Sequence, residues 1–213
     1  MALFDEKISN QLRSILNQMQ DNVKLVLFTQ EIECATCKAA HQMVEEIASL
    51  NNKLSLDVYS LVLDSEKAKQ YKVDKVPAIL LLDKDGNDTR MKFYGIPGGY
   101  EINSFLGAIL TVSGKRDVIP KVISERIAKI DKDIHMEVFV SLECPHCPTA
   151  VMAAHLLALE NPHIHADMIE SSSFIPLSIA NNISSVPKTI INGKMDFIGA
   201  QPVDMMLDML EKV

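Results

Sequence analysis

The chain has 213 residues, of which 47% are hydrophobic and 23% are charged, a composition typical of a globular protein. Its formal net charge of -7 and its pI near 5.4 argue against binding to nucleic acid or to an anionic membrane. No apolar run approaches the roughly 20 residues that a membrane helix requires. No signal peptide opens the sequence, so a soluble, cytoplasmic protein is expected.

The first half of the chain predicts alternating helices and strands. Ile8, Leu12, Ile15 and Met19 recur at helical spacing, whereas 25–29 is a short apolar run that suits a strand covered on both faces. Asp85-Gly86 is a turn signal between two strands. The expected elements are a helix over 8–19, a strand over 25–29, a helix over 37–50, a strand over 56–63, a helix over 65–71, strands over 78–82 and 90–94, and a helix over 100–112.

The second half predicts the same order with shorter parts. Asn192-Gly193 is a strong hairpin signal. The expected elements are a helix over 118–130, a strand over 136–140, a helix over 145–159, a strand over 164–169, a helix over 175–180, strands over 188–191 and 194–197, and a helix over 203–210. A short polar link near 113–116 separates the halves, which predicts an N-terminal domain over 1–114 and a C-terminal domain over 115–213.

Two separate features repeat at one offset. Cys34 and Cys37 lie 110 positions before Cys144 and Cys147, and Val76-Pro77 lies 110 positions before Val186-Pro187. The shared offset indicates an ancestral duplication. A C-x-x-C pair at the first strand-to-helix junction of such a unit is the thioredoxin arrangement. The predicted fold class is therefore α/β, with tandem thioredoxin-like folds that each have a central mixed β-sheet flanked by helices.

The paired cysteines suit dithiol exchange, which needs an attacking thiolate and a second thiol that resolves the mixed disulfide. A cysteine at the start of a helix is close to free backbone N–H groups and to the positive end of the helix dipole, and both favour the thiolate. The second sulfur of a C-x-x-C pair is one turn away. Cys34 and Cys144 are predicted to attack, and Cys37 and Cys147 to resolve.

The two cysteine pairs are expected to differ in reactivity. Pro145 suits the first position of a helix, and a protonated His146 would add positive charge. Neither aid is present between Cys34 and Cys37. The prediction is that Cys144 has the lower pKa and forms the more oxidising disulfide. Pro148 removes an early helical hydrogen bond and receives no role.

With both motifs in view, the sequence resembles the two-domain protein disulfide oxidoreductases, also called glutaredoxin-like proteins. The resemblance rests on both C-x-x-C sites, both Val-Pro pairs and the stretch Phe-Tyr-Gly-Ile-Pro-Gly-Gly-Tyr-Glu at 93–101. It implies cis bonds at Pro77 and Pro187 beside the cysteines. A cis bond there leaves the backbone of Val76 and Val186 open to strand-like pairing with a substrate.

The N-terminal region of the alkyl hydroperoxide reductase flavoprotein is a more distant resemblance. It has the same double fold, but its first unit lacks the cysteine pair. This sequence also departs from thioredoxins, because Glu33 and Glu143 stand where Trp usually precedes the first cysteine. The buried acid of thioredoxin corresponds to apolar Leu27 and Val138, so no general base is assigned.

The leading prediction is a thiol–disulfide oxidoreductase that reduces, forms or isomerises protein disulfides. Its expected partners are protein disulfide or dithiol substrates and a flavoprotein donor similar to thioredoxin reductase, with no cofactor besides the redox-active disulfides and no metal. A relay that passes electrons to a peroxidase and a chaperone-like binding module are the alternatives. A zinc or iron–sulfur site built by all four cysteines is a further alternative, although each pair belongs to a complete unit of its own.

Overall fold

The computed structural model describes residues 3–213. Its contacts divide the chain into two compact units. Unit 1 contains the chain through Thr89, 93–96 and 105–116, and unit 2 contains 90–92, 97–104 and 117–213. Within the described residues no helix is both long and apolar enough to cross a membrane.

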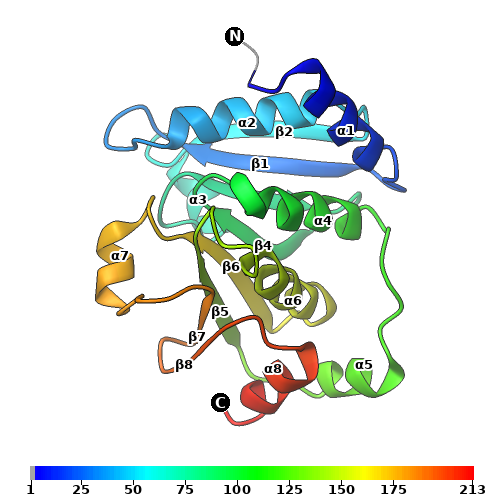
Figure 1. Cartoon of the computed structure of the whole chain (residues 1–213), viewed down its shortest axis with the longest axis vertical. Helices are drawn as coiled ribbons and strands as arrows, with labels where there is room; N and C mark the ends of the chain where they lie inside the picture. Colours follow the sequence, from blue (N-terminus) through cyan, green and yellow to red (C-terminus); the bar gives the residue numbers. More distant parts are fainter. Residues whose placement is uncertain (1–2) are drawn as a thin grey trace. The chain divides into compact units, whose positions relative to one another are not determined.

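Unit 1 is built on a sheet with the strand order β2-β1-β3-β4 (Figure 1). β1 pairs with β2 in parallel and with β3 in antiparallel orientation, so the sheet is mixed. The elements of the first half are α1 (Glu6–Leu16), β1 (Val23–Thr29), α2 (Cys37–Ser49), β2 (Leu54–Ser60), α3 (Ser65–Gln70), β3 (Ala78–Leu82), β4 (Asp88–Tyr94), the 3-10 turn η1 (Gly99–Glu101) and α4 (Ile102–Val112).

Unit 2 repeats this plan with the strand order β6-β5-β7-β8. β5 pairs in parallel with β6 and in antiparallel orientation with β7, which pairs with β8. The elements of the second half are α5 (Lys121–Ala128), β5 (Ile134–Val140), α6 (Cys147–Glu160), β6 (Ile164–Glu170), α7 (Ile175–Ala180), β7 (Lys188–Ile191), β8 (Met195–Ile198) and α8 (Val203–Leu210). The predicted tandem mixed sheets flanked by helices are confirmed.

The central strands of both units are buried, as their continuous apolar runs predicted. All five residues of β3 are buried, and so are the four residues of β7. α2 lies along β1 and β2, and α6 lies along β5 and β6 (Figure 1). Apolar side chains on both faces of each sheet therefore leave water together with the helices that cover them.

One hairpin has the turn that the sequence predicted, whereas one strand ends earlier than predicted. Asn192 and Gly193 both have positive φ, at 51° and 64°, as the two-residue turn between β7 and β8 requires. The strand expected over 56–63 ends at Ser60 instead. The apolar residues Val62 and Leu63 lie in an exposed loop, so an apolar run was wrongly taken as strand.

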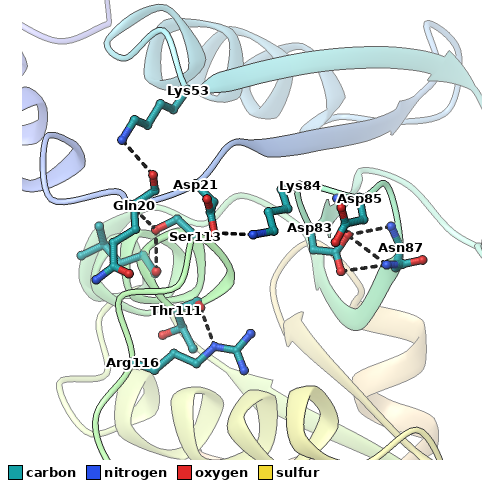
Figure 2. Close-up of polar contacts among 11 residues, drawn as sticks. Gln20, Asp21, Lys53, Asp83, Lys84, Asp85, Asn87, Thr111, Ser113 and Arg116 are labelled. Atoms are coloured by element: carbon teal, nitrogen blue, oxygen red, sulfur yellow. Dashed lines mark hydrogen bonds and ion pairs between the residues drawn. The ribbon is translucent and has the colours of Figure 1, made fainter.

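Polar contacts hold the edge of the unit 1 sheet where β1 begins (Figure 2). Lys53 Nζ donates to the carbonyl oxygens of Met19 and Gln20 at 2.7 and 2.9 Å. Asp21 forms an ion pair of 3.2 Å with Lys84, just after β3. These contacts lie at the end of the sheet where β1 starts. The cysteines lie at the other end, because they follow the last residue of β1.

Candidate functional site

Both cysteine pairs lie between the first strand of a unit and its longest helix. α2 begins at Cys37 and α6 begins at Cys147, so each helix starts at the second cysteine of its pair. Cys34 and Cys144 precede these helices in a turn, where the N–H of Cys147 donates to the carbonyl oxygen of Cys144 at 3.4 Å. Cys34 and Cys144 therefore lie just before the helix, at its amino end.

The placement of the prolines around the second pair differs from the prediction. Pro145 lies before the helix, because His146 is the N-cap of α6. Pro148 is the proline in the first turn, at the second helical position. A residue there has no intrahelical acceptor for its N–H, so Pro148 costs no helical hydrogen bond. Pro148, and not Pro145, is the proline that suits the start of this helix.

Each cysteine pair is closed as a disulfide, Cys34 with Cys37 and Cys144 with Cys147. The second sulfur of each pair is buried, with an exposed fraction of 2% for Cys37 and 0% for Cys147. Cys34 and Cys144 are partly exposed. A partner can therefore reach the first cysteine of each pair and not the second. Among residues 3–213, no three His, Cys, Asp or Glu side chains are grouped so that they could hold a metal ion.

The Val-Pro pairs lie beside the exposed sulfurs. Both Val76–Pro77 and Val186–Pro187 are cis, as the resemblance implied. Cys34 Sγ lies 3.7 Å from the carbonyl oxygen of Val76, and Cys144 Sγ lies 3.8 Å from that of Val186. The structure thus brings together, in each unit, the reachable cysteine and the backbone expected to pair with a substrate.

The shared geometry of the two sites does not extend to the residue before the first cysteine. Glu33 has a φ of 60°, in the left-handed region that favours glycine, whereas Glu143 is absent from the positive-φ residues that the structure describes. Both side chains are exposed. The turn into Cys34 is therefore strained in its backbone, and the turn into Cys144 is not.

Glu101 is a buried acid that the sequence analysis did not assign. Its exposed fraction is 0%, and Oε1 has no hydrogen-bond partner, while Oε2 accepts from the hydroxyl of Ser104. Burial raises the pKa of Glu101 to about 7, although the hydrogen bond from Ser104 acts in the opposite direction. The only signal in the sequence was its place at the end of the stretch 93–101.

The backbone next to Glu101 is tied to the second redox site. The N–H of Tyr100 donates to the carbonyl oxygen of Leu142 at 2.9 Å, two positions before Cys144. Gly99 packs against the same carbonyl so closely that a Cβ there would collide with it. η1, which contains Glu101, also contacts α6, the helix that begins at Cys147. Glu101 is therefore a buried, protonatable group in unit 2, one residue after the backbone N–H that holds the loop before Cys144.

The family model for the thioredoxin domain matches residues 134–211. Among solved structures, the N-terminal domain of the alkyl hydroperoxide reductase AhpF from Enterococcus faecalis is 31% identical, covers 97% of this chain and 99% of its own, and has a TM-score of 0.90. A protein disulfide oxidoreductase from Aeropyrum pernix is 27% identical, covers 97% of this chain and 92% of its own, and has a TM-score of 0.89. The sequence analysis expected AhpF to be more distant than the protein disulfide oxidoreductases. The likeness to AhpF is instead at least as strong as the likeness to the A. pernix protein.

AhpF of Staphylococcus aureus is 31% identical over 192 residues, which are 90% of this chain and 34% of the relative. The chain spans about a third of the length of the curated relatives it matches. The likeness to the E. faecalis domain extends over nearly the full length of both chains. The chain thus belongs to the thioredoxin superfamily, in the family of two-domain, glutaredoxin-like proteins that includes the N-terminal domain of AhpF and the protein disulfide oxidoreductase of A. pernix.

Proposed function

We propose that this chain is a thiol–disulfide oxidoreductase that exchanges electrons with protein substrates at two sites, Cys34–Cys37 and Cys144–Cys147. One observation carries the proposal: in each pair the first sulfur is partly exposed beside the carbonyl of a Val-Pro pair, and the second is buried. This arrangement lets a partner's sulfur approach the first cysteine while the second is protected from competing reactions. A purely structural disulfide has no need for it.

Reduction of a substrate takes two exchanges at one site. The thiolate of Cys144 attacks one sulfur of the substrate disulfide, forms a mixed disulfide and releases the other substrate sulfur as a thiolate. Cys147 loses its proton and attacks Cys144 Sγ, which forms the Cys144–Cys147 disulfide and releases the second substrate thiolate. Two electrons pass from the site to the substrate, and the two released thiolates take up the proton that Cys147 lost and one proton from water. Cys34 and Cys37 act in the same way, and oxidation of a substrate dithiol is the reverse.

Glu101 supplies a proton acceptor at the second site in this proposal. The buried thiol of Cys147 must lose its proton before it can attack, and water does not reach it. A carboxyl group with a pKa of about 7 is ionised in half of the molecules at neutral pH, so it can take up a proton and return it. Leu27, which corresponds to the buried acid of thioredoxin, gives the first site no such group.

The proposed electron donor is a flavin-dependent disulfide reductase. Its dithiol would reduce Cys144–Cys147 or Cys34–Cys37 by the same exchange. The proposal draws support from the curated relatives, which are about three times as long as the segment that matches this chain. We also propose that the chain works in the cytoplasm and holds no cofactor. In a reducing compartment, paired cysteines act as redox centres and not as structural cross-links.

A second candidate function is an electron relay to a peroxidase. The name of the S. aureus relative states that it is a subunit of an alkyl hydroperoxide reductase. In a relay, one C-x-x-C site of this chain would receive electrons from the donor and pass them to a peroxidase disulfide. Both candidates use the same chemistry and differ in the substrate.

Insulin reduction in the presence of dithiothreitol tests the proposed activity. Four forms of the full chain are compared: the native chain, Cys34→Ser/Cys37→Ser, Cys144→Ser/Cys147→Ser, and the variant with all four serines. We expect turnover in the first three forms and none above the dithiothreitol background in the fourth. Turnover that persists in the fourth form would contradict the proposal. Replacing insulin by an oxidised peroxidase in the same assay distinguishes the relay.

A further inference from the structure

Arg90 stands in β4 with an unusual backbone conformation. Its φ is 63°, in the left-handed region that favours glycine, whereas the residues of a strand normally have an extended backbone. A residue with a side chain keeps such a conformation only where the surrounding structure holds it there, and residues of this kind cluster at functional sites. The contacts of the Arg90 side chain indicate what this conformation serves.

The guanidinium of Arg90 lies at the carboxyl end of α6. Its Nε and Nη2 donate to the carbonyl oxygen of Ala158 at 3.2 and 2.7 Å, and Nη2 also donates to that of Leu159 at 3.4 Å. The last carbonyls of a helix have no donor within the helix, and Ala158 is fully buried. Arg90 therefore supplies the donors that this helix end needs, together with a positive charge that the helix dipole favours.

The short segment that carries Arg90 is itself anchored in unit 2. Residues 90–92 belong to this unit, and Lys92 Nζ lies 3.8 Å from the carboxylate of Asp167 on β6. Both side chains are almost fully buried, at 4% and 3% exposed, so salt screens this ion pair little. The carboxylate of Asp167 also contacts His135 Nε2, on β5, at 2.7 Å. Arg90 therefore extends from a backbone that is held to the sheet of unit 2.

α6 connects this anchor to the second redox site. The helix has 14 residues and begins at Cys147, so its ends are about 21 Å apart at a rise of about 1.5 Å per residue. Its hydrogen bonds run along its axis, so a shift at Ala158 is passed on to Cys147. Cys144 lies outside the helix, in a loop that the N–H of Tyr100 holds through the carbonyl oxygen of Leu142. The two sulfurs thus depend on separate anchors.

We propose that Arg90 is a positioning residue for the second redox site, because it fixes α6 along its axis and so holds Cys147 within reach of Cys144. The inference rests on the proposed function. In the dithiol form no covalent bond joins the two sulfurs, so the anchored helix sets the effective concentration of one sulfur at the other. A high effective concentration favours closure of the disulfide over a mixed disulfide with a partner.

The test measures the second site alone, in the full chain carrying Cys34→Ser/Cys37→Ser. The measured quantity is the equilibrium constant with glutathione. In this reaction the dithiol of the second site and one molecule of oxidised glutathione give the site disulfide and two molecules of reduced glutathione. A residue that only supports the fold stabilises the dithiol and disulfide forms equally, so its loss leaves this constant unchanged.

Three variants of this chain are compared with their parent. Arg90→Met removes the donors and keeps an unbranched side chain, and Arg90→Lys keeps the charge without the planar fork. Arg116→Met is the matched control. Arg116 Nε donates at 3.0 Å to the carbonyl oxygen of Thr111, in the last turn of α4, which carries no cysteine (Figure 2).

We expect Arg90→Met to lower the equilibrium constant by about tenfold, which raises the reduction potential of the site by about 30 mV. Arg90→Lys should shift the constant in the same direction by less, and it carries the test if Arg90→Met does not fold. Arg116→Met should match the parent. An unchanged constant in the folded Arg90 variants would overturn the inference, and so would an equal shift in Arg116→Met. A parent chain that does not exchange with glutathione would instead overturn the proposed function at this site, and the inference with it.

Discussion

The hydrogen bond from the N–H of Tyr100 to the carbonyl oxygen of Leu142 joins the stretch 97–104 to the loop that carries Cys144. Gly99 adds a close backbone approach to the same carbonyl, and Glu101 follows as a buried acid. Three consecutive residues thus fix the position of the loop and place a titratable group beside it. Changes at Gly99 and Glu101 are therefore expected to act on the second redox site.

Gly99→Ala should destabilise the protein by about 2 kcal/mol or more, because a Cβ would collide with Leu142 and because φ is +54°. The matched control is Gly86→Ala. Its φ is +84°, but nothing lies within 4 Å of the added Cβ, so only the backbone cost of about 1 kcal/mol remains. Urea denaturation measures both values. Equal losses at the two glycines would show that the contact with Leu142 contributes nothing.

Glu101 should make stability depend on pH. Its pKa is about 7 in the folded chain and 4.5 as a free side chain, so the folded state binds more protons between these values. Stability from this group is then full below pH 4.5 and is lost as pH rises towards 7, by about 3 kcal/mol in total. Glu101→Gln should remove that decline, which urea denaturation at pH 5 and pH 8 detects. Glu45→Gln, on an exposed side chain, is the control and should keep the slope of the native chain.

Glu101→Gln should also slow the second site by roughly a hundredfold at neutral pH, since proton transfer by a positioned group contributes about that much. The measurement is the rate of disulfide exchange in a Cys34→Ser/Cys37→Ser chain from pH 5 to pH 9. The native rate should rise with pH near 7, and the variant should lose that step. A variant that keeps the step with a lower plateau would indicate a structural role only.

His146 is expected to favour the thiolate of Cys144. It is the N-cap residue of α6 and is exposed, so its protonated ring would place a positive charge near the turn that holds Cys144. After reduction, Cys144 should react with iodoacetamide at a lower pH than Cys34, and His146→Ala should move the midpoint of the Cys144 reaction upward. Thr36→Ala, at the N-cap of α2, is the control for Cys34. An unchanged midpoint in His146→Ala would show that His146 does not favour the thiolate of Cys144.

Glu33→Gly should stabilise the chain by about 1 kcal/mol, because φ at this position is 60° and glycine adopts it without a steric cost. Glu143→Gly serves as the comparison. Its backbone does not need a glycine, so the greater freedom of the unfolded chain should make that variant slightly less stable. Thermal unfolding of the two variants with both disulfides intact provides the measurement, and opposite signs are the expected result.

Much of the fold could be predicted because the repeats reinforce one another. The C-x-x-C pairs, the Val-Pro pairs and the Asn192-Gly193 hairpin each specify local geometry that a short stretch of sequence determines. The end of β2 could not be predicted in this way. Hydrophobicity indicates burial, and Val62 and Leu63 are apolar residues that the fold leaves exposed. An apolar residue on the surface and one in the core look alike in a sequence.

Glu101 and Pro148 mark a second limit of the sequence. Whether an acid is buried depends on what packs over it, and the stretch 97–104 is far from Cys144 along the chain. Pro148 became understandable only when the first residue of α6 was fixed at Cys147, because its cost depends on its position within the first turn. A hydrophobic pattern cannot locate the first residue of a helix to within two positions. Such a shift decides whether Pro148 removes a helical hydrogen bond.

Each disulfide joins residues only three positions apart. The entropy that a cross-link removes from the unfolded chain grows with the length it encloses, and a ring this short is worth about 2 kcal/mol, against about 4.7 kcal/mol for a loop of 100 residues. Opening either bond therefore leaves most of the free energy of folding in place. Both sites can therefore be reduced and reoxidised while the fold stays intact, and the fully reduced molecule carries two pairs of electrons.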